Sequence, residues 1–176
     1  MKKEIYLAGG CFWGTEHYFK QIRGVIDTEA GYANGHASRP TYQDVCTDQT
    51  GFAETVRIVY DPEIISLKFL LELYFKSIDP LSVNRQGHDH GTQYRTGIYY
   101  TDASDLSVID EVYAAEQAKY TQPLAVEKQA LQIFYEAEDY HQDYLDKHPD
   151  GYCHLPVALF EFVRQANAEN EDKKNR

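Results

Sequence analysis

The chain has few cysteines and few basic residues. Its 176 residues include three cysteines, and 17 lysines and arginines stand against 28 aspartates and glutamates. Three cysteines are an odd number and too few for a disulfide-stapled scaffold, so they indicate thiol chemistry in a reducing compartment. The net charge of −11 argues against a nucleic-acid partner, because phosphates would be repelled by most of the surface. No apolar run approaches the roughly 20 residues that cross a bilayer, which argues against a membrane protein.

The ends of the chain set the expected limits of the folded part. Met1–Glu4 leads directly into a strand-like stretch and lacks the apolar core of a signal peptide, so we expect a cytoplasmic protein. The length predicts one catalytic domain, which we assign to residues 1–164, and we expect a monomer. Residues 165–176 are polar and almost free of bulky apolar side chains, which predicts a disordered tail.

Hydrophobic periodicity predicts strands and helices that alternate along the chain. Strands are expected at residues 4–8, 25–32, 55–60, 94–100 and 131–135, and helices at 12–22, 66–78, 104–119 and 140–147. The stretch 33–43 contains Gly, Pro and Ser and predicts a loop. Two successive strand–helix–strand units indicate a two-layer α+β domain, with helices on one face of a mostly antiparallel sheet.

Cys11 lies where a strand pattern stops and a helical pattern begins, in a run that starts Gly9-Gly10 and continues Phe12-Trp13. A thiol on the first turn of a helix meets unpaired backbone N–H groups and the positive end of the helix dipole, and both favour the thiolate. The glycines leave the sulfur uncrowded, and the two aromatic side chains can form an apolar wall beside it. The alternative is that Cys11 packs as a small buried hydrophobe. The setting favours a nucleophile.

The residues around Cys11 resemble the signature of the A-type peptide methionine sulfoxide reductases. Four further blocks resemble those of that family in the same order: Tyr42–Cys46, Thr50–Glu54, Arg85–Arg95 and Gly151–Cys153. The resemblance implies a ferredoxin-like fold with extra C-terminal elements and no cofactor. It also implies thiol-dependent reduction of methionine S-sulfoxide, free or in oxidised proteins, to methionine.

Reduction of a sulfoxide by a thiol needs a nucleophile, an acid for the oxygen and a second thiol. The resemblance implies that Cys11 attacks the sulfoxide and becomes a sulfenic acid, and that Glu54 protonates the oxygen. By its local sequence alone, Glu54 would be a solvated charge at the start of a strand. A carboxyl in an apolar cleft has a raised pKa and stays protonated near neutral pH, although its titration would be coupled to that of a nearby thiol.

The resemblance also assigns the substrate contacts. It implies that Tyr42 and Tyr94 donate hydrogen bonds to the sulfoxide oxygen, that Asp89 orients the substrate backbone, and that Phe12 and Trp13 hold the methyl group. There are 15 tyrosines in the chain, so any one of them is more often a packing residue. Position within a matched block singles out these two.

Cys153 lies far from Cys11 in the sequence, in a turn-like segment that we expect to be mobile and exposed. The resemblance implies that Cys153 attacks the sulfenic acid, and that thioredoxin reduces the resulting Cys11–Cys153 disulfide. The remaining cysteine, Cys46, is expected to pack as a small apolar residue.

The chain departs from the family pattern in three places. Phe52 stands where His is common, His88 stands where Asn is common, and no second recycling cysteine follows Cys153. The neighbours His88, Asp89 and His90 also suggest a metal site, but adjacent side chains diverge, so we expect no metal. Two other functions stay open: a Cys–His hydrolase that uses Cys11 and one of the histidines, and a binding module whose aromatic cage takes methylated cations.

Overall fold

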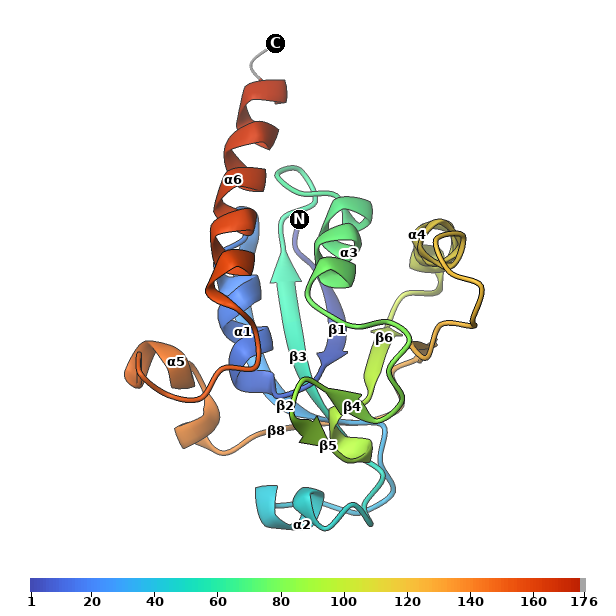
Figure 1. The fold of residues 1–176 in the computed structure, drawn as a ribbon, viewed down its shortest axis with the longest axis vertical. Coiled ribbons are helices and arrows are strands. Elements are labelled where there is room, and N and C mark those ends of the chain that lie inside the picture. Colours follow the sequence, from blue (N-terminus) through green and yellow to red (C-terminus); the bar gives the residue numbers. More distant parts are fainter. Residues whose placement is uncertain (175–176) are drawn as a thin grey trace.

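The structure, a computed structural model, describes residues 1–174, with side chains described through residue 166 (Figure 1). In this described part the centre is a six-stranded sheet in the order β7-β6-β1-β3-β2-β8. Neighbouring strands are antiparallel except β6 and β7, which are parallel. The strands are β1 (Lys3–Gly9), β2 (Val25–Ala33), β3 (Ala53–Tyr60), β6 (Thr96–Tyr100), β7 (Glu127–Ala130) and β8 (Phe134–Glu136).

Helices and a small hairpin surround this sheet. The helices are α1 (Phe12–Lys20), α2 (Tyr42–Cys46), α3 (Leu67–Lys76), α4 (Leu106–Gln117), α5 (Tyr144–Lys147) and α6 (Val157–Lys174). The 3-10 helices are η1 (Thr92–Tyr94), η2 (Ala103–Asp105) and η3 (Asp139–His141), and the hairpin consists of β4 (Arg85–Gln86) and β5 (Asp89–His90). The fold is therefore mixed α/β with a mainly antiparallel sheet.

The two faces of the sheet are covered differently, because side chains alternate along each strand. Ile5 and Leu7 of β1 join the large core that the sheet forms with the helices. Tyr6 and Ala8 point to the other face, where a smaller cluster is closed by Phe134. The Tyr6 and Phe134 rings meet edge to face with their centroids 4.9 Å apart.

Helix α3 shows how local signals fix an element. Ser66 caps its first turn by accepting a hydrogen bond from the Phe69 N–H at 3.1 Å. Leu70 and Tyr74 are fully buried, as the helical spacing of apolar residues predicted. The Tyr74 hydroxyl then donates to the Ala8 carbonyl of β1 at 2.6 Å, which ties the helix to the central strand.

The strand register brings distant blocks of the sequence to one end of the sheet. Gly9, at the end of β1, pairs with Thr96 at the start of β6. Glu54, at the start of β3, pairs with Tyr32 near the end of β2. Figure 1 shows α2 and the β4–β5 hairpin at this same end, opposite the N-terminus. The end of the sheet that carries Cys11 therefore also carries Glu54.

The structure differs from the sequence-based expectations in the C-terminal half and in several short elements. The tail expected to be disordered from residue 165 is helical through Lys174 as part of α6, and residues 175–176 lie outside the described residues. Figure 1 shows α6 running alongside α1. The elements α2, β4, β5, β7 and α6 were not predicted, and Tyr94 lies in η1 rather than in the following strand.

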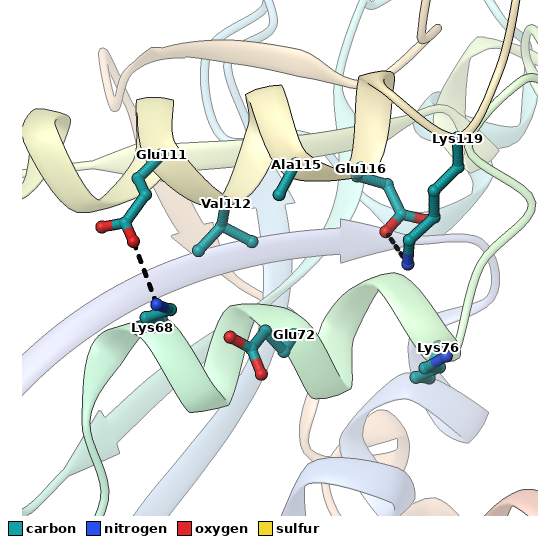
Figure 2. Close-up of a pocket in the computed structure, with 8 residues that line it drawn as sticks. All are labelled: Lys68, Glu72, Lys76, Glu111, Val112, Ala115, Glu116 and Lys119. Atoms are coloured by element: carbon teal, nitrogen blue, oxygen red, sulfur yellow. Dashed lines mark hydrogen bonds and ion pairs between the residues drawn. The ribbon is translucent and has the colours of Figure 1, made fainter.

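Helices α3 and α4 enclose a groove of about 320 Å³ whose walls carry mainly charged side chains (Figure 2). An ion pair between Lys68 and Glu111 at 3.0 Å bridges the two helices. The groove is lined by no cysteine, histidine or aromatic side chain, so it is not a candidate for thiol chemistry. Within residues 1–174, no helix is long and apolar enough to cross a membrane.

Candidate active site

The turn between β1 and α1 places Cys11 at the first turn of the helix. Cys11 is the N-cap residue of α1 and is 7% exposed. Gly10 before it has a φ of +89°, which favours glycine. A Cβ on Gly10 would also lie 2.8 Å from the Gln86 Cβ and 3.1 Å from His154 Nε2. The chain can therefore enter the helix here only without a side chain at position 10.

Cys11 and Glu54 share the free N–H groups at the start of α1. The Phe12 N–H donates to Glu54 Oε1 at 3.2 Å. The N–H groups of Trp13 and Gly14 face the Cys11 sulfur and lower its pKa, although the Cys11 side chain makes no capping hydrogen bond. A carboxyl and a thiol that are far apart in the sequence thus lie at the same helix end.

Burial controls the charge state of the carboxyl. Glu54 is 1% exposed, and this burial raises its pKa to about 8, with a further increase from Asp89 and an opposing effect of the Phe12 N–H. Glu54 is therefore mostly protonated at neutral pH. Among the described residues, Glu54 Oε2 has no hydrogen-bond partner, so a proton on that oxygen is free to be donated.

Burial also determines the state of Cys11. It raises the pKa of the thiol well above its ordinary value, and the field of Glu54 adds to the increase. The helix end favours the thiolate as expected, but it does not decide the charge state of Cys11 in the site without substrate. The helix N–H groups lower the pKa, but the loss of water around the sulfur outweighs them.

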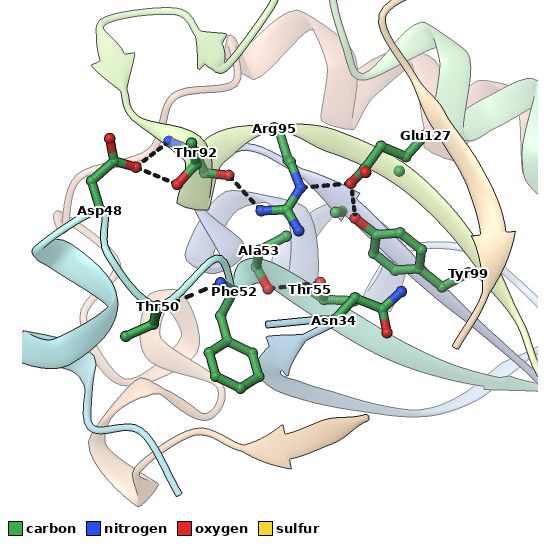
Figure 3. Close-up of polar contacts among 12 residues, drawn as sticks. Asn34, Asp48, Thr50, Phe52, Ala53, Thr55, Thr92, Arg95, Tyr99 and Glu127 are labelled. Carbon is green, nitrogen blue, oxygen red and sulfur yellow. Dashed lines mark hydrogen bonds and ion pairs between the residues drawn. The ribbon is translucent and has the colours of Figure 1, made fainter. Parts of the chain in front are cut away.

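Polar contacts hold Thr92, the first residue of η1, on two sides (Figure 3), and Tyr94 is the last residue of the same element. On one side, Asp48 accepts a hydrogen bond from the Thr92 N–H at 2.7 Å. On the other side, Arg95 donates to the Thr92 carbonyl at 2.9 Å and to Glu127 Oε1 at 2.6 Å. Burial first and Glu54 second raise the pKa of Tyr94, so its hydroxyl keeps its proton and can act as a donor.

Tyr42 begins the one-turn helix α2, which Thr41 caps through a reciprocal pair of hydrogen bonds with Asp44. The Tyr42 N–H donates to Glu138 Oε2 at 3.2 Å. Burial, followed by the field of Glu54, raises the pKa of the Tyr42 hydroxyl, so it is also a donor at neutral pH. Sequence reasoning missed Glu138, whose other oxygen accepts from the Tyr32 hydroxyl at 2.9 Å.

Aromatic side chains line the first turn of α1. The Trp13 ring stacks on Tyr144, with centroids 3.7 Å apart. Trp13 Nε1 donates to His141 Nδ1 at 2.9 Å, and the imidazole also contacts Phe12 and Tyr42 at centroid distances of 5.0 and 4.5 Å. His141 is fully buried and burial lowers its pKa, so it is neutral. Sequence analysis predicted a helix over residues 140–147 but did not indicate that His141 and Tyr144 contact Trp13.

Asp89 and the two residues that depart from the family pattern, Phe52 and His88, lie in different surroundings. Asp89 in β5 accepts a hydrogen bond from the Tyr152 hydroxyl at 2.9 Å, and its charge raises the pKa values of both Cys11 and Glu54. Phe52 is buried and meets Tyr135 edge to face at 5.8 Å, so it is a packing residue. His88 is exposed in the turn between β4 and β5.

The other two cysteines, Cys153 and Cys46, differ from expectation in how exposed they are. Cys153 is half-buried rather than exposed, and its Sγ lies 3.5 Å from the Leu155 carbonyl. A Cβ added to Gly14 would lie 3.1 Å from Cys153 Sγ, so Cys153 packs over the first turn of α1. It also lines a groove of about 440 Å³ between α1, α5 and α6. Cys46 is exposed rather than packed, because it ends a one-turn surface helix.

Metal-ligating side chains do not gather in the described part of the chain: no group of three or more His, Cys, Asp or Glu residues there could hold a metal ion.

The candidate site consists of a thiol, a protonated carboxyl and two phenols at one end of the sheet, with a second thiol packed over the same helix turn. Fold and site together define a thiol-based enzyme of mixed α/β architecture.

Comparisons with known proteins agree with this class. The chain belongs to the peptide methionine sulfoxide reductase family, whose sequence profile matches residues 3–174. It is 57% identical to the peptide methionine sulfoxide reductase MsrA of Clostridium acetobutylicum over 157 residues, which are 89% of this chain and 97% of the relative. It is 54% identical to MsrA of Lachnoclostridium phytofermentans, with 94% and 100% of the two chains covered.

Solved structures of relatives are also similar to this chain. Reduced Mxr1 of Saccharomyces cerevisiae matches with a TM-score of 0.83 and 38% identity, covering 88% of this chain and 91% of that one. Methionine sulfoxide reductase A of Corynebacterium diphtheriae matches with a TM-score of 0.78 and 34% identity, covering 86% and 77%. A structure of Mxr1 in complex with Trx2 matches with a TM-score of 0.58 and 26% identity, covering 81% and 84%.

Proposed function

We propose that this chain reduces methionine S-sulfoxide, free or within proteins, to methionine by the thiol chemistry of Cys11. Family membership supports the reaction type and its preference for the S epimer. The observation that carries the proposal is the pairing of Cys11 with a carboxyl that is protonated at neutral pH, at the same end of α1. The hydrolase and cation-cage alternatives give no role to such an acid.

The first step transfers one oxygen atom. The Cys11 sulfur attacks the sulfoxide sulfur and forms a transient sulfur–sulfur bond. This bond and the sulfur–oxygen bond of the substrate then break as the oxygen, carrying its new proton, bonds to the Cys11 sulfur and gives a sulfenic acid. Glu54 Oε2 gives its proton to the departing oxygen, and the resulting carboxylate takes the thiol proton of Cys11. The phenols of Tyr42 and Tyr94 donate hydrogen bonds to the oxygen as its charge grows. Methionine leaves as the reduced product.

The substrate is held by its apolar end and by its backbone. Phe12 and Trp13 form the wall for the methyl group, and the Trp13 ring is fixed by stacking on Tyr144 and by its hydrogen bond to His141. Asp89 accepts a hydrogen bond from the substrate backbone. These contacts support recognition of the methionine side chain with little demand on the neighbouring residues, which suits repair of many proteins.

The second step uses Cys153. Its sulfur attacks the sulfenic acid of Cys11, which gives a disulfide and water, and a thioredoxin then reduces the disulfide by thiol exchange. The position of Cys153 over the first turn of α1 supports this role, and so does the solved complex of the relative Mxr1 with Trx2. The groove beside Cys153 carries apolar side chains from Leu155, Val157 and Phe160, where a reductant can approach.

Three cysteine variants test this cycle. We expect Cys11→Ser to abolish reduction of methionine S-sulfoxide with either dithiothreitol or thioredoxin. We expect Cys153→Ser to keep activity with dithiothreitol and to lose most activity with thioredoxin. The matched control is Cys46→Ser, which should keep most of both activities because Cys46 is the exposed third thiol. Full thioredoxin-dependent activity in Cys153→Ser would remove the resolving role.

We also propose an oligomeric state, a cellular location and a fold subclass for the protein. The described site residues all come from one chain, which supports a working monomer. The need for a dithiol reductant supports a cytoplasmic location. The strand order β6-β1-β3-β2, with α1 and α3 between consecutive strands, supports a ferredoxin-like core to which the remaining strands are added.

A further inference from the structure

His154 follows Cys153 directly, and its imidazole packs among glycines at the end of β1 and the start of α1. Its Nε2 lies 2.9 Å from the Gly9 carbonyl oxygen. A carbonyl only accepts hydrogen bonds, so Nε2 carries the hydrogen and donates it. The other ring nitrogen, Nδ1, therefore has a free lone pair. It is buried and has no hydrogen-bond partner among the described residues.

The free nitrogen of His154 and the thiol of Cys153 face the same residue, Gly14. Both approach the position that a Cβ on Gly14 would occupy, Nδ1 to 2.8 Å and the Cys153 sulfur to 3.1 Å. The absence of a side chain at Gly14 is what leaves room for them. The thiol of Cys153 currently contacts the Leu155 carbonyl at 3.5 Å. Transfer of the thiol proton to His154 therefore requires the Cys153 side chain to turn away from the Leu155 carbonyl.

Cys153 needs a base before it can attack. Burial raises the pKa of its thiol, so the fraction of thiolate at neutral pH is small. Burial also lowers the pKa of His154, so its imidazole is neutral and able to accept a proton. The groups that favour a positive ring are the Gly9 carbonyl on Nε2 and the Asp89 carboxylate on β5. The ring is thus oriented by one group and stabilised by another, as a general base requires.

We infer that His154 is the general base of the second step and takes the thiol proton of Cys153 through Nδ1. This inference rests on the proposed resolving role of Cys153. The Cys153–Cys11 sulfur–sulfur bond forms, the sulfur–oxygen bond of the sulfenic acid breaks, and the oxygen leaves as water. The proton that completes this water is the one that His154 has taken from Cys153. The sulfenic sulfur is reduced to the disulfide level while the Cys153 sulfur is oxidised to it.

Two variants separate the basic nitrogen from the structural hydrogen bond. His154→Gln keeps an N–H that can reach the Gly9 carbonyl but has no basic nitrogen, and His154→Ala has neither. The matched control is His36→Gln, which replaces an exposed imidazole on the loop before α2. Each reduced full-length protein is mixed with N-acetylmethionine S-sulfoxide in the absence of reductant. Quenched samples are assayed for N-acetylmethionine formed, which reports the first step. They are also assayed for loss of the second thiol, which reports the disulfide, because sulfenic acid formation already removes the first thiol.

We expect N-acetylmethionine formation to be close to the wild-type rate in all variants. Disulfide formation should be about 10²-fold slower in both His154 variants, the usual scale of general base catalysis, and unchanged in His36→Gln. The pH profile gives a second readout. In the wild type the rate of disulfide formation should be nearly independent of pH above the pKa of His154. In the variants it should rise about tenfold per pH unit with the thiolate fraction of Cys153.

The outcomes are distinguishable. If the wild type forms no Cys11–Cys153 disulfide, the resolving role itself fails. If the wild type forms it and His154→Gln matches the wild type in rate and pH profile, the base assignment is overturned and His154 is at most an anchor for the segment. Slower disulfide formation with the wild-type pH profile in both variants would also overturn it, because a displaced segment slows the step without changing its proton dependence.

Discussion

Replacement of Glu54 by Gln should stabilise the protein while it removes activity. Glu54 is buried at the end of α1, with one oxygen bonded to the Phe12 N–H and the other without a partner among the described residues. Glutamine has nearly the same shape and is neutral at every pH. The variant therefore keeps the packing and the helix-end contact, and it removes the need to protonate a carboxyl on folding.

The size of the effect follows from the pKa of Glu54. The folded protein holds the proton up to about pH 8, whereas an exposed glutamate releases it near pH 4.5. Between these values the folded state binds more protons than the unfolded state, so the wild type loses stability as the pH rises. At 1.36 kcal/mol per pH unit, the wild type should be less stable than Glu54→Gln by about 3 kcal/mol at pH 7 and by about 5 kcal/mol above pH 8.

Urea denaturation of the reduced proteins measures this difference, and the fluorescence of Trp13, the one tryptophan, reports unfolding. The two free energies of unfolding should agree near pH 4.5 and diverge as the pH rises to about 8. The control Glu161→Gln, at an exposed position of α6, should stay within about 0.5 kcal/mol of wild type at each pH. A difference that does not change with pH, or a less stable Glu54→Gln protein at pH 8, would refute the reasoning.

Three further predictions concern the site. Single-turnover formation of methionine should decline above about pH 8 in the wild type as Glu54 loses its proton, and Glu54→Gln should be at least about 10²-fold slower without this decline. Gly14→Ala should form the disulfide about tenfold more slowly by thiol titration, because its methyl would lie 3.1 Å from the Cys153 sulfur; an unchanged rate would contradict the packing described. Trp13→Phe should lower the free energy of unfolding by about 1–2 kcal/mol, since it leaves the buried His141 Nδ1 without its donor, and equal denaturation midpoints would argue against that bond.

The parts of the fold that could be predicted are those with strong local signals. Helix α3 has a Ser66 cap and a regular apolar stripe, and the structure confirms it within two residues at each end. Strand β7 has no such signal, because its residues Glu127–Ala130 are polar and its order comes from parallel pairing with β6. The whole of helix α6 was missed, because its residues after 164 are polar and its apolar first turns are ordered by packing on α1.

The candidate site also divides into residues that the sequence indicated and residues that it did not. Motif blocks identified Cys11 and Glu54, and the strand register explains why they meet, but the sequence did not indicate how deeply the thiol is buried. The helix-end argument for a thiolate was sound as a local contribution and was outweighed by desolvation. His141 and His154 were missed because a single histidine has no period and no partner within its own segment. Each acquires its environment from the first turn of α1.

The raised pKa values of Cys11 and Glu54 have one functional explanation. Without substrate, both groups keep their protons, because a thiolate would face the carboxyls of Glu54 and Asp89 in a site with little water. In the proposed mechanism a sulfoxide oxygen accepts the proton of Glu54 and the carboxylate that remains accepts the proton of Cys11, so one carboxyl serves both transfers. A carboxyl with an ordinary pKa would have no proton to give at neutral pH, and one with a much higher pKa would give it too reluctantly. If the proposed mechanism holds, the roughly 3 kcal/mol of stability that the wild type should forgo at pH 7 is a physical requirement of the reaction, and a substitution that recovers it by removing the proton should also remove the chemistry.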